Sequence, residues 1–104
     1  MAEIKEYKNL INGEWKESKE QITIYSPIDN KEIGKVQAMT HKEIDDAMAA
    51  AKAAMKAWRE VPIVERAKVL YKAAELLEKR KNEIGEVLAE EVAKNLKSAV
   101  SEVV

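Results

Sequence analysis

The chain has 104 residues, of which 46% are apolar and 36% are charged, and its 18 basic and 19 acidic residues leave a formal net charge of -1. This balance gives no single-sign field to attract nucleic acid or an anionic membrane, so neither partner is expected. The sequence has no cysteine, which excludes disulfides and thiolate sites within it and favours a reducing, cytoplasmic compartment. No stretch approaches the roughly 20 apolar residues that span a bilayer.

Residues 1–39 are predicted to form a β-rich opening. Asn12-Gly13 is a strong hairpin signal, because both residues tolerate the positive φ of a tight type I′ turn. We therefore expect Tyr7 to Ile11 to pair with Trp15 to Glu17, and Trp15 to dock on a helix.

Two further short strands are expected before residue 40. The run Gln21 to Tyr25 stops at Ser26-Pro27, since proline cannot donate to a strand ladder, and Asp29-Asn30 then turns the chain. Ile33 to Ala38 forms the last strand, and Gly34 inside it suggests a bulge or a close backbone approach.

Residues 40–104 are predicted to form a helical layer. Thr40 and Glu43 make a capping box at the start of its first helix. Spacings of three and four then give one apolar stripe, which we expect to pack in a core. The stripe consists of Ile44, Ala47, Met48, Ala51, Met55 and Trp58.

The second helix is expected to begin at Val61-Pro62 and to end at Lys79-Arg80-Lys81, whose positive charges would complement the helix dipole. Asn82 would then cap a third helix, with Ile84, Val87, Leu88 and Val92 on its inward face. Leu96 to Val104 continues in a helical pattern with no closing signal, so we expect the chain to be a piece of a longer protein. The pattern as a whole predicts an α+β piece, in which short hairpin strands precede three to four amphipathic helices.

Candidate chemical groups are few. His41, the only histidine, lies in a first helical turn without a second ligand, and a surface role is more plausible than catalysis. The carboxylate pairs Glu83/Glu86 and Glu90/Glu91 lie on a lysine-rich helix and indicate a solvated face. The three glycines stand alone and form no phosphate loop. We therefore assign no catalytic, cofactor-binding or metal-binding residue to this chain.

The order of the segments is more informative than any single motif. Asn9-Leu10-Ile11-Asn12-Gly13-Glu14-Trp15 is followed by Tyr25-Ser26-Pro27, by Ile33-Gly34-Lys35-Val36 and by an alanine-rich helix ending in Ala57-Trp58. This order resembles the N-terminal segment of the aldehyde dehydrogenase superfamily. The resemblance implies that residues 1–104 are the N-terminal part of the coenzyme-binding domain of an α/β parent.

One departure narrows the resemblance. Where most of the superfamily has Glu-Thr-Gly-Lys-Pro, this chain has Glu91-Val92-Ala93-Lys94-Asn95, and the tail Lys97 to Val104 is similar to the non-phosphorylating, NADP-dependent glyceraldehyde-3-phosphate dehydrogenase branch. This implies a homo-oligomeric parent that oxidises glyceraldehyde 3-phosphate to 3-phosphoglycerate, through a cysteine thiohemiacetal and hydride transfer to NADP. The resemblance places the residues for this chemistry after Val104, so the piece alone should be inactive and its partner should be the remainder of the parent. The alternative is a free-standing, non-catalytic helical module for assembly.

Overall fold

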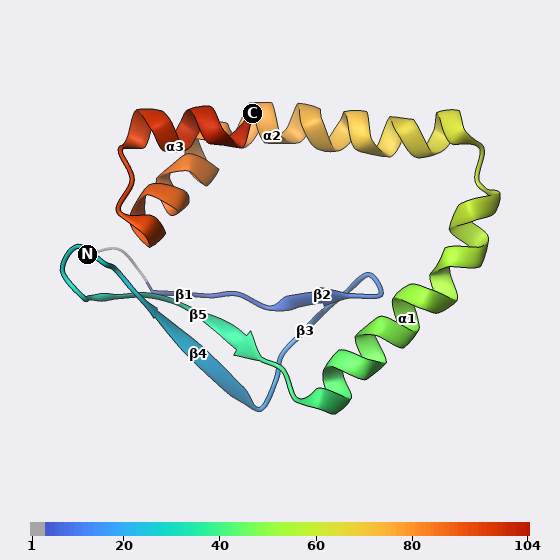
Figure 1. Ribbon diagram of the computed structural model, residues 1–104, viewed down its shortest axis with the longest axis horizontal. Coiled ribbons are helices and arrows are strands. Elements are labelled where there is room, and N and C mark those ends of the chain that lie inside the picture. Colours follow the sequence, from blue (N-terminus) through green and yellow to red (C-terminus); the bar gives the residue numbers. More distant parts are fainter. Residues whose placement is uncertain (1–3) are drawn as a thin grey trace. The chain divides into compact units, whose positions relative to one another are not determined.

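The computed structural model describes residues 4–104, which form two compact units (Figure 1). The first unit contains the chain up to Ile24 together with Glu32–Glu60, and the second contains Tyr25–Lys31 together with Val61–Val104. Short strands precede three helices, so the predicted α+β class is confirmed. No helix within residues 4–104 combines the length and the apolar character that a membrane crossing requires.

The predicted hairpin is present in the first unit. Strand β2 (Asn9–Ile11) runs antiparallel to β3 (Glu14–Lys16), and the turn between them has positive φ at Asn12 (51°) and Gly13 (77°), as a type I′ turn requires. The expected docking of Trp15 is wrong, because its side chain is 68% exposed. Trp15 lies opposite Leu10 in the ladder, on the alternate side from Ile11, which is half-buried.

A three-stranded sheet has the order β1-β5-β4. Strands β4 (Glu20–Tyr25) and β5 (Glu32–Ala38) match the prediction, whereas β1 (Lys5–Glu6) was not predicted. β1 runs parallel to β5 and places Lys5 opposite Gly34. A Cβ atom on Gly34 would lie 3.3 Å from the carbonyl oxygen of Lys5, which confirms the close backbone approach expected at this glycine.

Helix α1 (His41–Glu60) begins as its capping box predicts. The Glu43 carboxylate accepts a hydrogen bond from the Thr40 backbone N–H at 2.7 Å, and the Thr40 hydroxyl accepts one from the Glu43 N–H at 3.2 Å. The predicted core packing of the α1 stripe is not realised by residues 4–104, because α1 has no buried residue.

Helix α2 (Ile63–Val92) is a single helix of 30 residues, so the break predicted at Lys79-Arg80-Lys81 and the cap at Asn82 are wrong. Pro62 precedes the helix as expected, but no proline follows to interrupt it. Ion pairs at i,i+3 cross the expected break, between Glu78 and Lys81 and between Arg80 and Glu83. The basic residues therefore lie within the helix and do not complement the dipole at its end.

The second unit is held by the packing of α3 (Leu96–Val103) on α2 (Figure 1). α2 ends at Ala93, which has left-handed geometry with φ of 55°, and the Asn95 side chain caps α3 by accepting from the backbone N–H groups of Lys97 and Ser98. Ala99 of α3 is fully buried, and Gly85 is the one buried residue of α2. The core of this unit therefore lies at the crossing of the two helices.

The close crossing predicts that Gly85→Ala separates α3 from α2. An added Cβ would lie 2.6 Å from Cγ2 and 2.8 Å from Cα of Val100, and the backbone contact cannot be relieved by rotating a side chain. Overpacking costs about 1–3 kcal/mol, which outweighs the gain of about 1 kcal/mol in helix propensity. We expect faster amide hydrogen exchange throughout α3. The control Asn82→Ala, at an exposed site on α2, should leave that exchange unchanged, and slower exchange in Gly85→Ala would contradict the packing argument.

The strained end of α2 predicts that Ala93→Gly is stabilising. An L-residue with left-handed φ costs about 1–2 kcal/mol. Glycine removes most of that cost but makes the unfolded chain more flexible, which costs about 0.4–1 kcal/mol, so a net gain of about 0.5–1 kcal/mol is expected. Ala89→Gly in the body of the same helix should destabilise by about 1 kcal/mol. Urea unfolding followed by helical circular dichroism measures both, and equal effects of the two changes would refute the strain at position 93.

Candidate functional site

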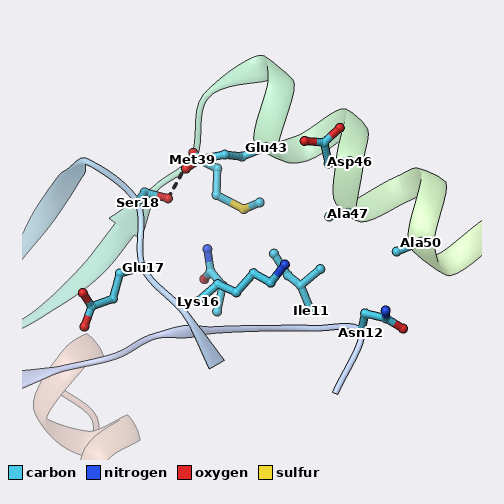
Figure 2. Close-up of a pocket in the computed structure, with 11 residues that line it drawn as sticks. Ile11, Asn12, Lys16, Glu17, Ser18, Met39, Glu43, Asp46, Ala47 and Ala50 are labelled. Carbon is cyan, nitrogen blue, oxygen red and sulfur yellow. Dashed lines mark hydrogen bonds between the residues drawn. The ribbon is translucent and has the colours of Figure 1, made fainter. Parts of the chain in front are cut away.

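The candidate site in the first unit is a cavity between the β2–β3 hairpin and the N-terminal half of α1, with a volume of about 170 Å³. Figure 2 shows Ile11 and Met39 within it, with Ala47 and Ala50 on the helix and charged groups around the rim. The residues that line it are Asn9, Ile11, Asn12, Lys16, Glu17, Ser18, Met39, Glu43, Asp46, Ala47 and Ala50. Its floor is apolar and its edge is polar, as in many small-molecule pockets, although its volume is smaller than most of them.

A buried glutamine organises the polar side of this region. Gln37 of β5 is only 7% exposed, and its side-chain oxygen accepts a hydrogen bond of 2.8 Å from the Ser18 backbone N–H. Its side-chain nitrogen donates to the Tyr7 carbonyl oxygen at 3.0 Å. One amide therefore joins three segments that are distant in sequence, and its burial is compensated because both ends are hydrogen-bonded.

The capping box of α1 belongs to the same network. The Ser18 hydroxyl donates to Oε2 of Glu43 at 3.1 Å, as Figure 2 shows, and the same oxygen accepts from the Thr40 N–H. These hydrogen bonds favour the carboxylate form, so the pKa of Glu43 lies below its ordinary value, with the Thr40 N–H as the main cause and Ser18 as a lesser one. The β3–β4 connection is thus attached to the start of the helix.

The charged groups at the rim are already paired with neighbours outside the cavity. Glu17 lies 3.0 Å from Lys8, and Asp46 lies 2.6 Å from Lys42. Over residues 4–104, no three acidic, histidine or cysteine side chains are grouped so that they could hold a metal ion. The Ser18 hydroxyl lies beside the Glu43 carboxylate, but the same carboxylate oxygen accepts from the Thr40 N–H and caps α1. The arrangement therefore supports a structural junction.

The residues considered from sequence lie apart from this junction. His41 is the first residue of α1 and is exposed, and it makes no contact in the network. Glu83 pairs with Arg80 on α2, in the other unit. Sequence reasoning missed Gln37 and Ser18. Strand β5 mixes polar and apolar residues, with Glu32 and Lys35 beside Gln37, so no local signal marked the glutamine for burial.

The lowered pKa of Glu43 predicts a pH-dependent contribution to the stability of the first unit. Because the folded pKa is below the unfolded value, this contribution is fully present above the ordinary value of 4.5 and is lost as the pH falls through the folded pKa. Glu43→Gln retains an acceptor for Thr40 and should flatten the pH dependence, whereas Glu43→Ala should also destabilise the unit at neutral pH. Urea unfolding between pH 3 and 7 tests both; an unchanged pH profile in Glu43→Gln would refute the assignment.

Comparison with known proteins places these features in a family. The model of the aldehyde dehydrogenase family matches residues 15–104. The NADP-dependent glyceraldehyde-3-phosphate dehydrogenase of Streptococcus equinus is 54% identical over 100 residues, a match that covers 96% of this chain and 21% of that protein. The enzyme of the same description from Zea mays is 45% identical over 100 residues, covering 94% of this chain and 20% of its own.

Solved structures agree with these matches. The NADP-dependent glyceraldehyde-3-phosphate dehydrogenase of Bacillus halodurans C-125, complexed with NADP, superposes with a TM-score of 0.92 at 45% identity, covering 94% of this chain and 21% of that one. A variant of the 1-pyrroline-5-carboxylate dehydrogenase of Thermus thermophilus gives a TM-score of 0.92 at 34% identity, covering 96% of this chain and 20% of that one. The chain thus spans about a fifth of the length of the relatives it matches. It belongs to the aldehyde dehydrogenase family.

Proposed function

We propose that this chain is the N-terminal part of an NADP-dependent aldehyde dehydrogenase that oxidises glyceraldehyde 3-phosphate to 3-phosphoglycerate. The observation that carries the proposal is the 54% identity to the Streptococcus equinus enzyme, which exceeds the 38% identity to the malonate-semialdehyde dehydrogenase of Lacticaseibacillus casei. Relatives with the same description from maize and pea, at 45% and 42% identity, support the same substrate. The parent would work as a cytoplasmic homo-oligomer.

The residues of this chain do not fit a coenzyme site. Gly13 lies in a hairpin turn, Gly34 in a strand and Gly85 at a helix crossing, so none of them opens a strand–loop–helix cradle for a pyrophosphate. We propose that the remainder of the parent binds NADP. Residues 1–104 would then contribute the outer part of the coenzyme-binding domain, with a β-rich opening over 1–39 and a helical layer over 40–104.

The catalytic groups of the proposed reaction also lie outside this chain. Oxidation through a thiohemiacetal needs a thiolate, which is the strong nucleophile near neutral pH, and residues 1–104 contain no cysteine. The role proposed for this chain is therefore to support the site and not to perform the chemistry.

Enzyme assays test both parts of the proposal. The purified 104-residue chain with glyceraldehyde 3-phosphate and NADP should give no increase in absorbance from NADPH. The full-length parent should produce NADPH with this aldehyde more efficiently than with malonate semialdehyde or other aldehydes. NADPH formation by the chain alone would overturn its supporting role, and a parent that prefers another aldehyde would overturn the substrate.

The second candidate is a free-standing helical module that assembles with partners and does not catalyse. It is favoured by the exposure of apolar side chains along α1 and α2, such as Met48 at 66% and Leu70 at 73%. Reading the gene beyond the codon for Val104 separates the candidates. An open frame that continues to a cysteine and a glutamate supports the dehydrogenase, and a stop codon supports the module.

A further inference from the structure

One charged side chain in the first turn of α2 has no hydrogen-bond partner within residues 4–104. The Nε atom of Arg66 is closed off from solvent, and no acceptor among the described residues lies within hydrogen-bonding distance of it. Within residues 63–80, all of which the structure describes, Arg66 and Ala67 are partly buried and the others are exposed. A buried donor without an acceptor is rare in folded proteins, so Arg66 needs an explanation.

The charge on this side chain makes the missing acceptor costly. Arginine stays protonated in proteins, so it cannot escape the cost of burial by giving up its proton, as a buried lysine can. A charged donor that is closed off from water and unpaired also loses more free energy than a neutral donor does. We therefore expect the whole folded protein to supply an acceptor for the Nε atom of Arg66.

The carboxylates on the same stretch of α2 are paired with lysines. Oε1 of Glu65 lies 2.8 Å from Nζ of Lys68, and Oε2 of Glu75 lies 3.3 Å from Nζ of Lys72. The positive charge of Arg66 is therefore not balanced by either of them. Its position in the first turn adds to the imbalance, because the N-terminus of a helix is itself partly positive. The missing acceptor is accordingly expected to carry negative charge.

The geometry of a guanidinium group specifies the kind of acceptor. Its Nε and one Nη atom donate side by side, and this fork matches the two oxygens of a carboxylate. An exposed apolar side chain can pack against any apolar surface, whereas this group selects its partner by charge and shape. The chain spans about a fifth of the length of its relatives and superposes on one of them with a TM-score of 0.92, so most of the side chains around α2 in such a protein belong to the rest of it.

We propose that Arg66 forms a buried ion pair with an aspartate or glutamate of the remainder of the parent, and that this pair joins the start of α2 to it. The inference rests on the proposed function only in that the chain must be part of a longer protein, and it does not depend on which aldehyde that protein oxidises. Removal of one partner from such a pair leaves the other charge buried and alone, so the loss of Arg66 should weaken the parent strongly.

Cross-linking of the full-length parent identifies the carboxylate. Arg66→Lys places an amine at this position, and a carbodiimide activates a carboxylate in contact with it, so that the amine displaces the urea and forms an amide. Mass spectrometry should find position 66 joined to one aspartate or glutamate beyond residue 104. The control Arg80→Lys should be joined to Glu83, with which Arg80 pairs at 2.7 Å. No cross-link from position 66, or one to residues 1–104 of the same or a second copy, would overturn the proposal.

The half-life of the parent during thermal inactivation tests the energetic coupling. Arg66→Met should shorten it about tenfold or more, as should changing the cross-linked carboxylate to its amide, and the double variant should lose no more than either single variant. Arg80→Met, which removes an exposed pair, should change it less than about twofold. Additive losses in a parent that oxidises glyceraldehyde 3-phosphate would refute the ion pair alone. Coupled losses in a parent that prefers another aldehyde would support the pair and refute only the substrate.

Discussion

The constraint on which this structure depends is that an amphipathic helix needs a surface to cover its apolar face. α1 and α2 have 20 and 30 residues, whereas the strands have between two and seven residues each. Strands this short offer little apolar surface, and α1 accordingly buries no residue. The last part of α2 packs against α3, and there the contact is so close that glycine alone fits at position 85. The described residues therefore hold their local structure with little shared core.

Hydrogen bonds hold connections and helix ends in place where apolar packing is sparse. In the first unit, Gln37 and Glu43 attach a connection between strands to the sheet and to the start of α1. In the second unit, Asn95 caps α3 immediately after the left-handed residue that ends α2. A residue without a side-chain acceptor at position 95 would leave the backbone N–H groups of Lys97 and Ser98 without this cap. The strained residue that ends α2 is thus followed, two residues later, by a cap that stabilises the start of α3.

Features that depend on adjacent residues could be predicted from the sequence. Asn12-Gly13 predicted the hairpin, and Thr40 with Glu43 predicted the start of α1, because turns and caps are decided within four residues. Features that depend on distant residues could not. The pairing of β1 with Gly34 and the burial of Gln37 are invisible in a local pattern. The same holds for α2, where a basic run followed by asparagine looked like an ending, although α3 packs across the next turn and the helix continues.

The cavity of the first unit acts as a junction between the β3–β4 connection and the start of α1. The chain aligns with about a fifth of each relative, and its polar groups are used to join its own segments. Apolar side chains of α1 and α2, such as Met48 and Leu70, are exposed in the described residues.

The placement of the aromatic side chains gives the two units different optical properties. Both tryptophans, Trp15 on β3 and Trp58 on α1, belong to the first unit, and the second unit has only tyrosines. Tryptophan emission therefore reports on the hairpin and α1 alone, whereas far-ultraviolet dichroism is weighted toward the 30 residues of α2. If the units unfold independently, the two signals will change at different denaturant concentrations, and their separation will measure how far one unit relies on the other.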